Sequence, residues 1–531
     1  MTTTQHYING KIFTGKSESE FVTAFKVADG KIEWVGSSEE VKTVNAINLQ
    51  GKTVLPGFLD VHTHPVWVAN ILQGVPCIIP FVRNIDGMIK ALRNSQQAGQ
   101  GEHVWIEGWG YDESKLAELR TPTVEDLDQV SATQPVFVYR SDCHSSICNT
   151  KALQLAGITK DTPNPPHGII GRFENGEPNG VLTEFSATKL ILNCKPVRGF
   201  EEDAKTLAGA AEHYNKRGIV AMTDLMGLEN PYSYSDLYRR AEELGLKQNT
   251  VIYPLFSELK AAGISEIAEE NKNGLSKIGG VKLFLDGTIS SRSAWIKEPY
   301  TGTSDFYGAK TEDEDVMREA FDYAKRNNIQ LAIHAMGDAS IQLIIDLFKD
   351  EEPWIESRPP VRIEHVTLIS QHQLDPIKGA KMKFGLIPQM IFFFAEYDSY
   401  RANLTDEQFA KTYAIKSMYD TCEYVAVSSD APATPWAEPD DVFISIQALV
   451  TRIAAEGQDI VQAQKLTVPQ AVLLYTGKAH DIALLPNVGK IQPGFDASFI
   501  VLTDDIFTVP TNKIGNVQVE NTYIRGERVW G

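Results

Sequence analysis

Two histidines separated by one residue follow an apolar run near the N-terminus. His62 and His64 come after Val54–Val61. Because side chains alternate between the faces of a strand, residues two apart point to the same side. Two imidazoles at this spacing can chelate one divalent metal ion such as zinc. An isolated His-x-His pair is usually two polar loop residues, but the buried run and its turn Leu55-Pro56-Gly57 favour a metal site.

Three further candidate ligands share this placement after an apolar run. They are His334 after Gln330–Ile333, His365 after Val361–Glu364, and Asp430 after Tyr424–Ser428. Taken alone, each is more often structural, since buried histidines commonly donate to carbonyls and aspartates after strands commonly cap helices. A closed barrel of parallel strands brings all strand ends to one mouth, so together they predict one site.

A lysine, Lys282, interrupts the apolar run Val281–Leu285. A buried lysine is costly as a cation and tends to lose its proton. A neutral amine can react with carbon dioxide to give a carbamate, whose two oxygens could bridge two metal ions. Spacing alone favours the plainer alternatives, a salt bridge to Asp286 or a side chain that faces outward.

The elements that must position these residues alternate short apolar runs with amphipathic stretches, which indicates βα units and a parallel sheet. Candidate strands cover Val54–Val61, Ile219–Asp224, Val251–Phe256, Val281–Leu285, Gln330–Ile333, Val361–Glu364, Lys383–Ile387 and Tyr424–Ser428. Expected helices include Glu201–Lys216, Glu312–Asn327 and Ser340–Lys349. The predicted fold class is α/β, a (β/α)8 TIM barrel over residues 54–484.

Both chain ends are rich in short strands and turns. Strand-like segments are Phe21–Val27, Ile32–Val35, Ala497–Leu502, Val517–Ile524 and Glu527–Trp530. We expect residues 1–53 and 485–531 to form one small β-sandwich domain. The gap of about 150 residues between the first two barrel strands predicts a large insertion within 66–215, over the active site. It contains the strand-like segments His103–Glu107 and Pro135–Tyr139.

Composition narrows the class of protein. The chain has 531 residues, of which 43% are hydrophobic and 22% charged, as in ordinary globular proteins. A net charge of −19 argues against nucleic acid and anionic membranes as partners. Five cysteines without a C-x-x-C pair are expected to be buried free thiols, although Cys143 and Cys148 could form a second metal or redox site. With no signal-peptide pattern and no long apolar run, a soluble cytoplasmic protein is expected.

The combined pattern resembles the amidohydrolase superfamily, and finer motifs resemble its YtcJ-like branch. These motifs are Leu55–His64, Asp142-Cys143-His144-Ser145 with Asn149, Gly180–Glu184, Lys282–Gly287, His334–Asp338, Arg362–His365 and the segment around Asp430. The resemblance implies a barrel with a β-sandwich made from both ends, and hydrolysis of carbon–nitrogen bonds in amides. It also implies one or two divalent metal ions, zinc being favoured, held by His62, His64, Lys282, His334, His365 and Asp430. On this basis Lys282 is expected to be carboxylated and to bridge the metals.

Two departures from the branch put its substrate preference in doubt. Cys143-His144-Ser145 stands where relatives often carry Gly-His-Ser, and Ala339 stands where an arginine is common.

The expected mechanism starts from a metal that lowers the pKa of bound water towards 7 and polarises the substrate carbonyl. Asp430 would accept the water proton and pass it to the leaving nitrogen. His144 would stabilise the oxyanion, unless it is a surface or packing residue.

Aromatic and basic residues suggest a substrate pocket. Trp109, Tyr111, Phe392 and Phe394 could line it, although aromatic clusters are more often core. Arg292 could bind a substrate carboxylate or form a structural ion pair. Two alternatives remain open for the whole chain: a deaminase of a cyclic amidine or heterocycle, and a non-catalytic binding or regulatory relative. The expected partner is a small molecule, and a homodimer is suggested only by the habit of the superfamily.

Overall fold

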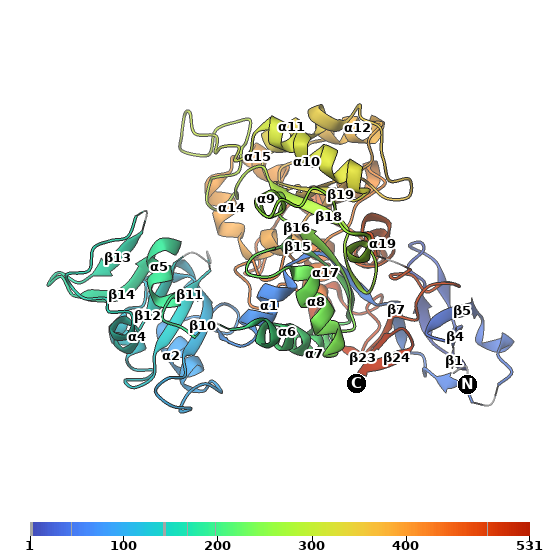
Figure 1. Cartoon of the computed structure of the whole chain (residues 1–531). Helices are drawn as coiled ribbons and strands as arrows, with labels where there is room; N and C mark the ends of the chain where they lie inside the picture. Colours follow the sequence, from blue (N-terminus) through green and yellow to red (C-terminus); the bar gives the residue numbers. More distant parts are fainter. Residues whose placement is uncertain (1–3, 44, 142–144, 167, 197, 486) are drawn as a thin grey trace. The chain divides into compact units, whose positions relative to one another are not determined.

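The computed structural model describes residues 4–43, 45–141, 145–166, 168–196, 198–485 and 487–531. The chain is mixed α/β and divides into two units (Figure 1). The larger unit comprises Met1–Pro65, Leu207–Asp430 and Asp440–Gly531, and the smaller unit comprises Val66–Thr206 and Ala431–Pro439.

Two parallel four-stranded sheets form the centre of the larger unit. The first contains, in order, β17 (Ser276–Ile278), β16 (Asn249–Pro254), β15 (Ile219–Gly227) and β8 (Phe58–Thr63). The second contains β18 (Gly280–Phe284), β19 (Gln330–Ala335), β20 (Val361–His365) and β21 (Phe384–Ile387). A parallel bridge from Leu255 to Lys282 connects the two sheets. Most strand residues are buried, as expected for β-branched runs covered on both faces.

Two of the expected strands differ from the prediction. The run 54–61 divides at Gly57, where any side chain would collide with Val220. Its first part, β7 (Thr53–Pro56), joins another sheet, and only β8 enters the parallel sheet. The run 424–428 forms no continuous strand, but it lies parallel to β21 through a bridge between Val425 and Leu386, with backbone bonds of 3.0 and 3.1 Å from Leu386 to Tyr424 and Ala426.

Helices connect the strands of the larger unit and cover them. They are α6 (Phe200–Gly209), α7 (Ala211–Lys216), α8 (Tyr234–Glu243), α9 (Phe256–Ala261), α10 (Glu314–Asn327), α11 (Asp338–Phe348), α12 (Gln371–Gly379), α13 (Met390–Ala395), α14 (Tyr397–Asn403), α15 (Asp406–Ala410), α16 (Ile415–Thr421), α17 (Val442–Thr451), α18 (Val468–Leu474) and α19 (Gly477–Ile482). Most of α6 belongs to the smaller unit. The helix expected over 201–216 is interrupted at Ala210, so it becomes α6 and α7.

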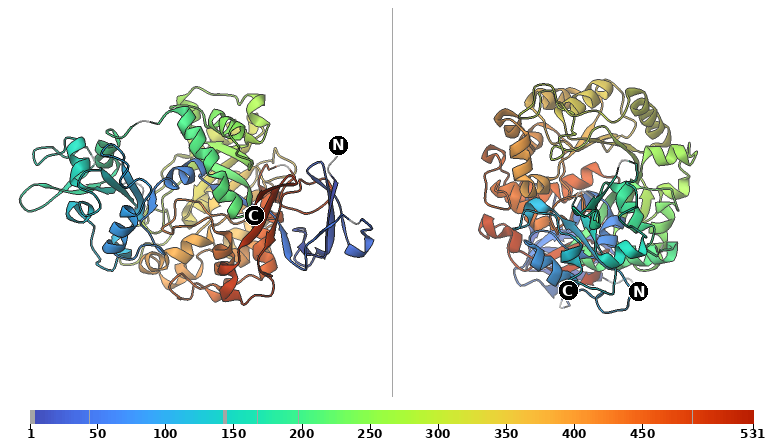
Figure 2. Two further views of the ribbon diagram at one scale, coloured as in Figure 1. Left: turned by 90° about the horizontal axis from the view of Figure 1, so that it is seen from below. Right: turned by 90° about the vertical axis from the view of Figure 1, so that its left-hand side faces the viewer.

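Strands from both chain ends pair within the larger unit. One sheet contains β5 (Lys31–Gly36), β4 (Ala24–Ala28), β1 (Thr4–Ile8) and β6 (Ile47–Asn48). The other contains β24 (Glu527–Trp530), β23 (Val519–Ile524), β22 (Phe499–Leu502), β7, β2 (Lys11–Phe13) and β3 (Phe21–Val22). Figure 2 shows these N-terminal and C-terminal strands side by side. The buried ring of Phe499 contacts Tyr7 at 5.1 Å and Tyr523 at 4.4 Å between centroids, so the two sheets share a core.

The smaller unit contains one six-stranded sheet. Its strand order is β13 (Ile169–Arg172), β14 (Pro178–Thr183), β12 (Ser146–Cys148), β11 (Val136–Arg140), β10 (Ile106–Tyr111) and β9 (Val75–Pro76). Its other helices are α1 (Pro65–Ile71), α2 (Ile85–Arg93), α3 (Val124–Leu127), α4 (Thr150–Leu155) and α5 (Phe185–Leu192).

Two expectations from the sequence concern the state of the cysteines and the presence of a membrane-spanning helix. Cys77, Cys148 and Cys422 are buried free thiols, whereas Cys194 is free but exposed. Cys143 lies outside the described residues. Within the described ranges, every helix is too short or too polar to cross a membrane.

Candidate metal centre

The ends of the parallel strands carry the predicted ligands to one place. His62 lies on β8, Lys282 on β18, His334 on β19 and His365 at the end of β20. Ring centroids are 4.9 Å apart for His62 and His365 and 4.2 Å apart for His334 and His365. All of these side chains are buried. The histidines that follow separate apolar runs in the sequence therefore lie close together in the structure.

The tightest group of candidate ligands is His62, His365 and Asp430. One ligand atom of each lies within 4.8 Å of the others. The Asp430 carboxylate is 3.2 Å from Nε2 of His62, 2.9 Å from Nε2 of His64 and 3.9 Å from Nδ1 of His365. Imidazole nitrogen with carboxylate oxygen is a donor set that suits zinc and similar divalent metals.

Two histidines of the site are in the form that a metal requires. Burial lowers the pKa of His334 to about 3 and lowers the pKa of His365 well below its usual value. Both rings are therefore neutral, which is the ligating state. Nδ1 of each has no hydrogen-bond partner among the described residues, a costly condition for a buried polar atom. A bound cation would remove that cost.

The charge of the site also fits a cation. Burial disfavours an ionised Asp430, but His62 and His64 outweigh it and hold the pKa of Asp430 well below its usual range. The other carboxylate of the site, Glu364, already has a cationic partner, because Arg362 donates to it at 2.7 Å in a fully buried pair. Asp430 therefore stays ionised beside the histidines, and this set of imidazole nitrogens and one carboxylate fits a divalent metal ion.

Lys282 is buried in β18 with an exposed fraction of 1%. It does not face outward, and the described residues give it no ion pair with Asp286. Burial lowers the pKa of Lys282 to about 8, although Glu364 and Asp430 pull it upward. A lowered pKa increases the fraction of the side chain that is a neutral amine, which is the form that reacts to give a carbamate. Its role as a metal ligand stays a prediction.

Sequence reasoning missed the residue that orients His62. Glu364 accepts a hydrogen bond from Nδ1 of His62 at 2.7 Å, which turns Nε2 towards Asp430. Arg362 in turn donates to Tyr253 Oη at 3.0 Å and to the Val61 carbonyl at 2.6 Å. Burial opposes the charge of Glu364, but Arg362 and His62 hold the pKa of that carboxyl at about 2. The presence of Arg362 and Glu364 inside the apolar run Val361–Glu364 is the feature of the sequence that could have indicated this ion pair.

Exchanging Glu364 for Gln should weaken metal binding about 10- to 100-fold, because partners that orient a ligating histidine contribute that much. The neutral amide would also leave the Arg362 charge uncompensated. Competition with a chromogenic chelator measures the affinity. Glu319→Gln, at an exposed ion pair with Lys260, is the control and should change nothing. Equal affinity in the Glu364 variant and the wild type would contradict this role.

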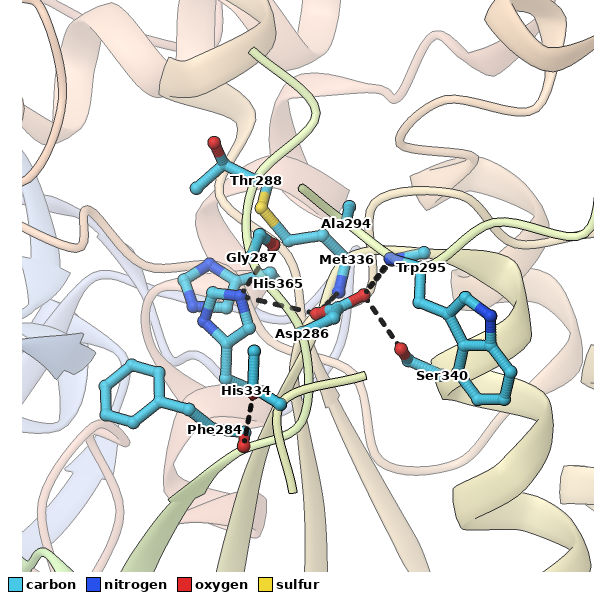
Figure 3. A network of polar contacts seen from close by, with 12 residues as sticks. Phe284, Asp286, Gly287, Thr288, Ala294, Trp295, His334, Met336, Ser340 and His365 are labelled. Carbon is cyan, nitrogen blue, oxygen red and sulfur yellow. Dashed lines mark hydrogen bonds and ion pairs between the residues drawn. The ribbon is translucent and has the colours of Figure 1, made fainter. Parts of the chain in front are cut away.

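A second buried carboxylate fixes the loop after β18. Asp286 accepts four hydrogen bonds, from the backbone amides of Trp295, Met336 and Gly337 and from the hydroxyl of Ser340. Figure 3 shows this network beside His334 and His365. Gly287 follows Asp286 in this loop. Nε2 of His334 lies 3.1 Å from the Gly287 carbonyl and donates to it when the ring is neutral. The loop therefore sets the orientation of the His334 ring.

Hydrogen bonds to residues of β8, rather than a place in a continuous strand, position Asp430. The Asp60 carboxylate on β8 accepts from the amide of Ser429 at 3.1 Å and from its hydroxyl. The amide of Asp430 donates to the His62 carbonyl at 2.8 Å. Asp430 itself has a left-handed backbone with φ of +54°. These bonds hold its carboxylate beside His62 although the segment has no ladder.

Three predicted substrate residues lie in the larger unit. Phe392 on α13 stacks against His365, with ring centroids 6.0 Å apart and an interplanar angle of 9°. Phe394 is buried on the same helix. Arg292 donates through Nε to the side-chain amide oxygen of Asn403 at 2.7 Å. Substrate contacts of all three stay predictions.

The remaining predicted residues belong to the smaller unit. Trp109 and Tyr111 lie on β10, and Tyr111 is buried in a hydrophobic cluster of that unit. Their contact with substrate stays a prediction. His144 lies outside the described residues, and so does its predicted role.

Comparison with known proteins places this site in a family. The sequence model of a family described as the amidohydrolase family matches residues 45–530. The chain belongs to the amidohydrolase family. As a member, it is a hydrolase that acts on carbon–nitrogen bonds.

Individual relatives cover nearly the whole chain of this amidohydrolase. It is 27% identical to YtcJ of Bacillus subtilis (strain 168), which is named as an amidohydrolase, over 98% of both chains. It is 26% identical to an N-substituted formamide deformylase of Arthrobacter pascens, over 98% of this chain and 97% of that protein. The fold is similar to that of an uncharacterised metal-dependent hydrolase of Pyrococcus horikoshii OT3, with a TM-score of 0.74 and 25% identity over 96% of this chain and 99% of the other.

Proposed function

We propose that this amidohydrolase cleaves the carbon–nitrogen bond of a small N-substituted amide. The observation that carries the proposal is the buried group of His62, His365 and Asp430, whose ligand atoms lie within 4.8 Å of one another at the ends of parallel strands. The relative named as an N-substituted formamide deformylase supports this class of substrate. We further propose zinc as the metal, held by His62, His64, Lys282, His334, His365 and Asp430.

The proposed reaction assigns one task to Asp430. When bound, the metal supplies Lewis-acid activation of the substrate carbonyl and of water. Asp430 is held as a carboxylate by His62 and His64, so it is ready to accept the proton of the attacking water. It then passes that proton to the leaving nitrogen, acting first as general base and afterwards as general acid.

Lys282 decides whether one or two ions bind. In the two-ion form the neutral amine of Lys282 adds to the carbon of carbon dioxide, an N–C bond forms and one proton leaves to solvent. Its burial and lowered pKa support this addition. The carbamate then provides two oxygens where the amine had one nitrogen.

We also propose the fold predicted from the sequence as the frame of this site. The two parallel sheets are joined by the Leu255–Lys282 bridge, and the Leu386–Val425 bridge extends the second sheet; together they would make a barrel over residues 54–484. The bond from the Asp430 amide to the His62 carbonyl supports closure between the last segment and β8. The shared aromatic core supports a sandwich of residues 1–53 and 485–531. The smaller unit then corresponds to the insertion proposed within 66–215.

The function is tested with zinc-loaded protein and a panel of N-alkyl formamides, N-alkyl acetamides and amino-substituted heterocycles in ¹⁸O-labelled water. We expect equal amounts of acid and amine, with one ¹⁸O atom in the acid and none in the amine. Mass spectrometry of both products measures this. Release of ammonia from heterocycles alone would instead make the protein a deaminase. No product from fully metallated protein would reject hydrolysis in favour of a binding role.

A further inference from the structure

An exposed phenylalanine lies beside the buried metal site. Phe284 is the last residue of β18, and 39% of its surface is accessible. It is two residues after Lys282, so both side chains point to the same face of the strand. Nζ of Lys282 is 4.8 Å from the centre of its ring. The His334 ring centroid is 5.4 Å away, and Figure 3 shows the two rings together. Phe284 therefore borders two of the proposed ligands.

The backbone holds this ring in place. The amide of the next residue, Leu285, donates to the His334 carbonyl at 3.1 Å, and the hydroxyl of Thr311 donates to the Phe284 carbonyl at 3.1 Å. The backbone at the end of β18 therefore forms hydrogen bonds on both of its sides. The exposure of Phe284 is a property of the ordered sheet and does not come from fraying.

Phe284 is the accessible end of a row of rings. His334 and His365 are 4.2 Å apart between centroids, and Phe392 stacks on His365. Phe392 is only 6% exposed, so Phe284 alone of the two phenylalanines offers a large area to solvent. Exposed apolar surface is unfavourable in water, and an apolar ligand group that covers it gains binding free energy.

We propose that Phe284 binds an apolar alkyl or aryl group of the substrate, which makes the substrate class amides with an apolar substituent. The inference rests on the proposed function, because it places that group next to the ligands of the proposed metal. Contact with one phenylalanine ring is worth about a 10- to 100-fold gain in affinity for the group that covers it.

The test compares wild type with Phe284→Ala on four compounds: N-methylformamide, N-hexylformamide, N-methylacetamide and N-methylhexanamide. A six-carbon chain is the nitrogen substituent in N-hexylformamide and the acyl group in N-methylhexanamide, and these two are the hexyl compounds. In the variant, kcat/KM should fall about 10- to 100-fold for at least one hexyl compound and less than about threefold for the short ones. Phe284→Leu, which keeps an apolar side chain, should recover most of the loss.

Phe21→Ala is the matched control. Phe21 is 37% exposed, is on a strand and also has a lysine ammonium, Lys11, 5.6 Å from its ring, but it lies in the sheet formed by both termini. It should behave as wild type with all four compounds. Metal content and thermal midpoint of each variant check that the site and fold are retained.

Calorimetric binding of the same compounds separates this inference from the proposed function. Tighter binding of a hexyl compound by wild type, lost in Phe284→Ala, supports the inference even if no compound is hydrolysed, in which case the proposed function fails alone. Equal affinity of wild type for short and hexyl compounds, or an equal loss for all four in the variant, would overturn the role of Phe284.

Discussion

Exchanging Asp430 for Asn should reduce turnover by about 10²- to 10⁴-fold, the usual contribution of a general acid–base group. The amide keeps an oxygen beside His62 and His64 but cannot take up the proton of water. Metal content should remain close to that of wild type. Amine release measures the rate, and elemental analysis of the same sample measures the metal.

The control for this variant is Asp420→Asn. Asp420 is a half-exposed residue of α16 that forms an ion pair with Lys416, and its loss should leave the rate unchanged. An Asp430→Asn protein that is fully metallated and fully active would remove Asp430 from the mechanism. A rate loss accompanied by complete metal loss would make it a ligand without the proton-transfer task.

Removing His365 should abolish both metal binding and turnover. His365 is one of the three residues whose ligand atoms lie closest together, and its neutral ring is already poised to ligate. A metal that polarises a carbonyl contributes several kcal/mol, so we expect a loss of about 10³-fold or more in kcat/KM for His365→Ala. Chelation of wild type should give the same loss, and added zinc or manganese should restore wild type but not the variant.

His480→Ala is the matched control for that experiment. His480 is also buried, burial also lowers its pKa to about 3, and it lies on α19 among Arg358 and Phe495. Its removal should lower stability without changing the metal content of the folded protein. If His480→Ala lost as much metal as His365→Ala, the effect would reflect damage to the fold and not to the site.

The convergence of the candidate histidines could be predicted from the sequence because one rule governs where they lie. Parallel strands bury continuous apolar runs and carry the next polar residue to the same edge, so His62, His334 and His365 follow directly from where the runs end. The rule describes 424–428 less well, because this run forms no continuous strand. The Leu386 amide donates to the Tyr424 carbonyl at 3.0 Å and the Ala426 amide to the Leu386 carbonyl at 3.1 Å, so the run still lies against β21. The bond from the Ser429 amide to the Asp60 carboxylate, which fixes the residues that follow, joins distant positions and leaves no pattern in the local sequence.

The residues missed by sequence reasoning depend on tertiary neighbours. Glu364 matters because it meets His62, which is 302 positions away in the chain. Asp286 could be mistaken for the partner of Lys282, but backbone amides of later segments take up its carboxylate. Phe284 is indistinguishable from a core residue within its apolar run, and only its place at the strand end makes it accessible.

The central claim is that a metal ion binds where His62, His365 and Asp430 converge. Anomalous diffraction at the zinc absorption edge, from crystals of zinc-loaded protein, tests it most directly. The account predicts an anomalous peak in contact with these three side chains, and a second peak next to Lys282 if that residue is carboxylated. Zinc-loaded crystals with no peak at these residues, or with the only peak elsewhere in the chain, would contradict it.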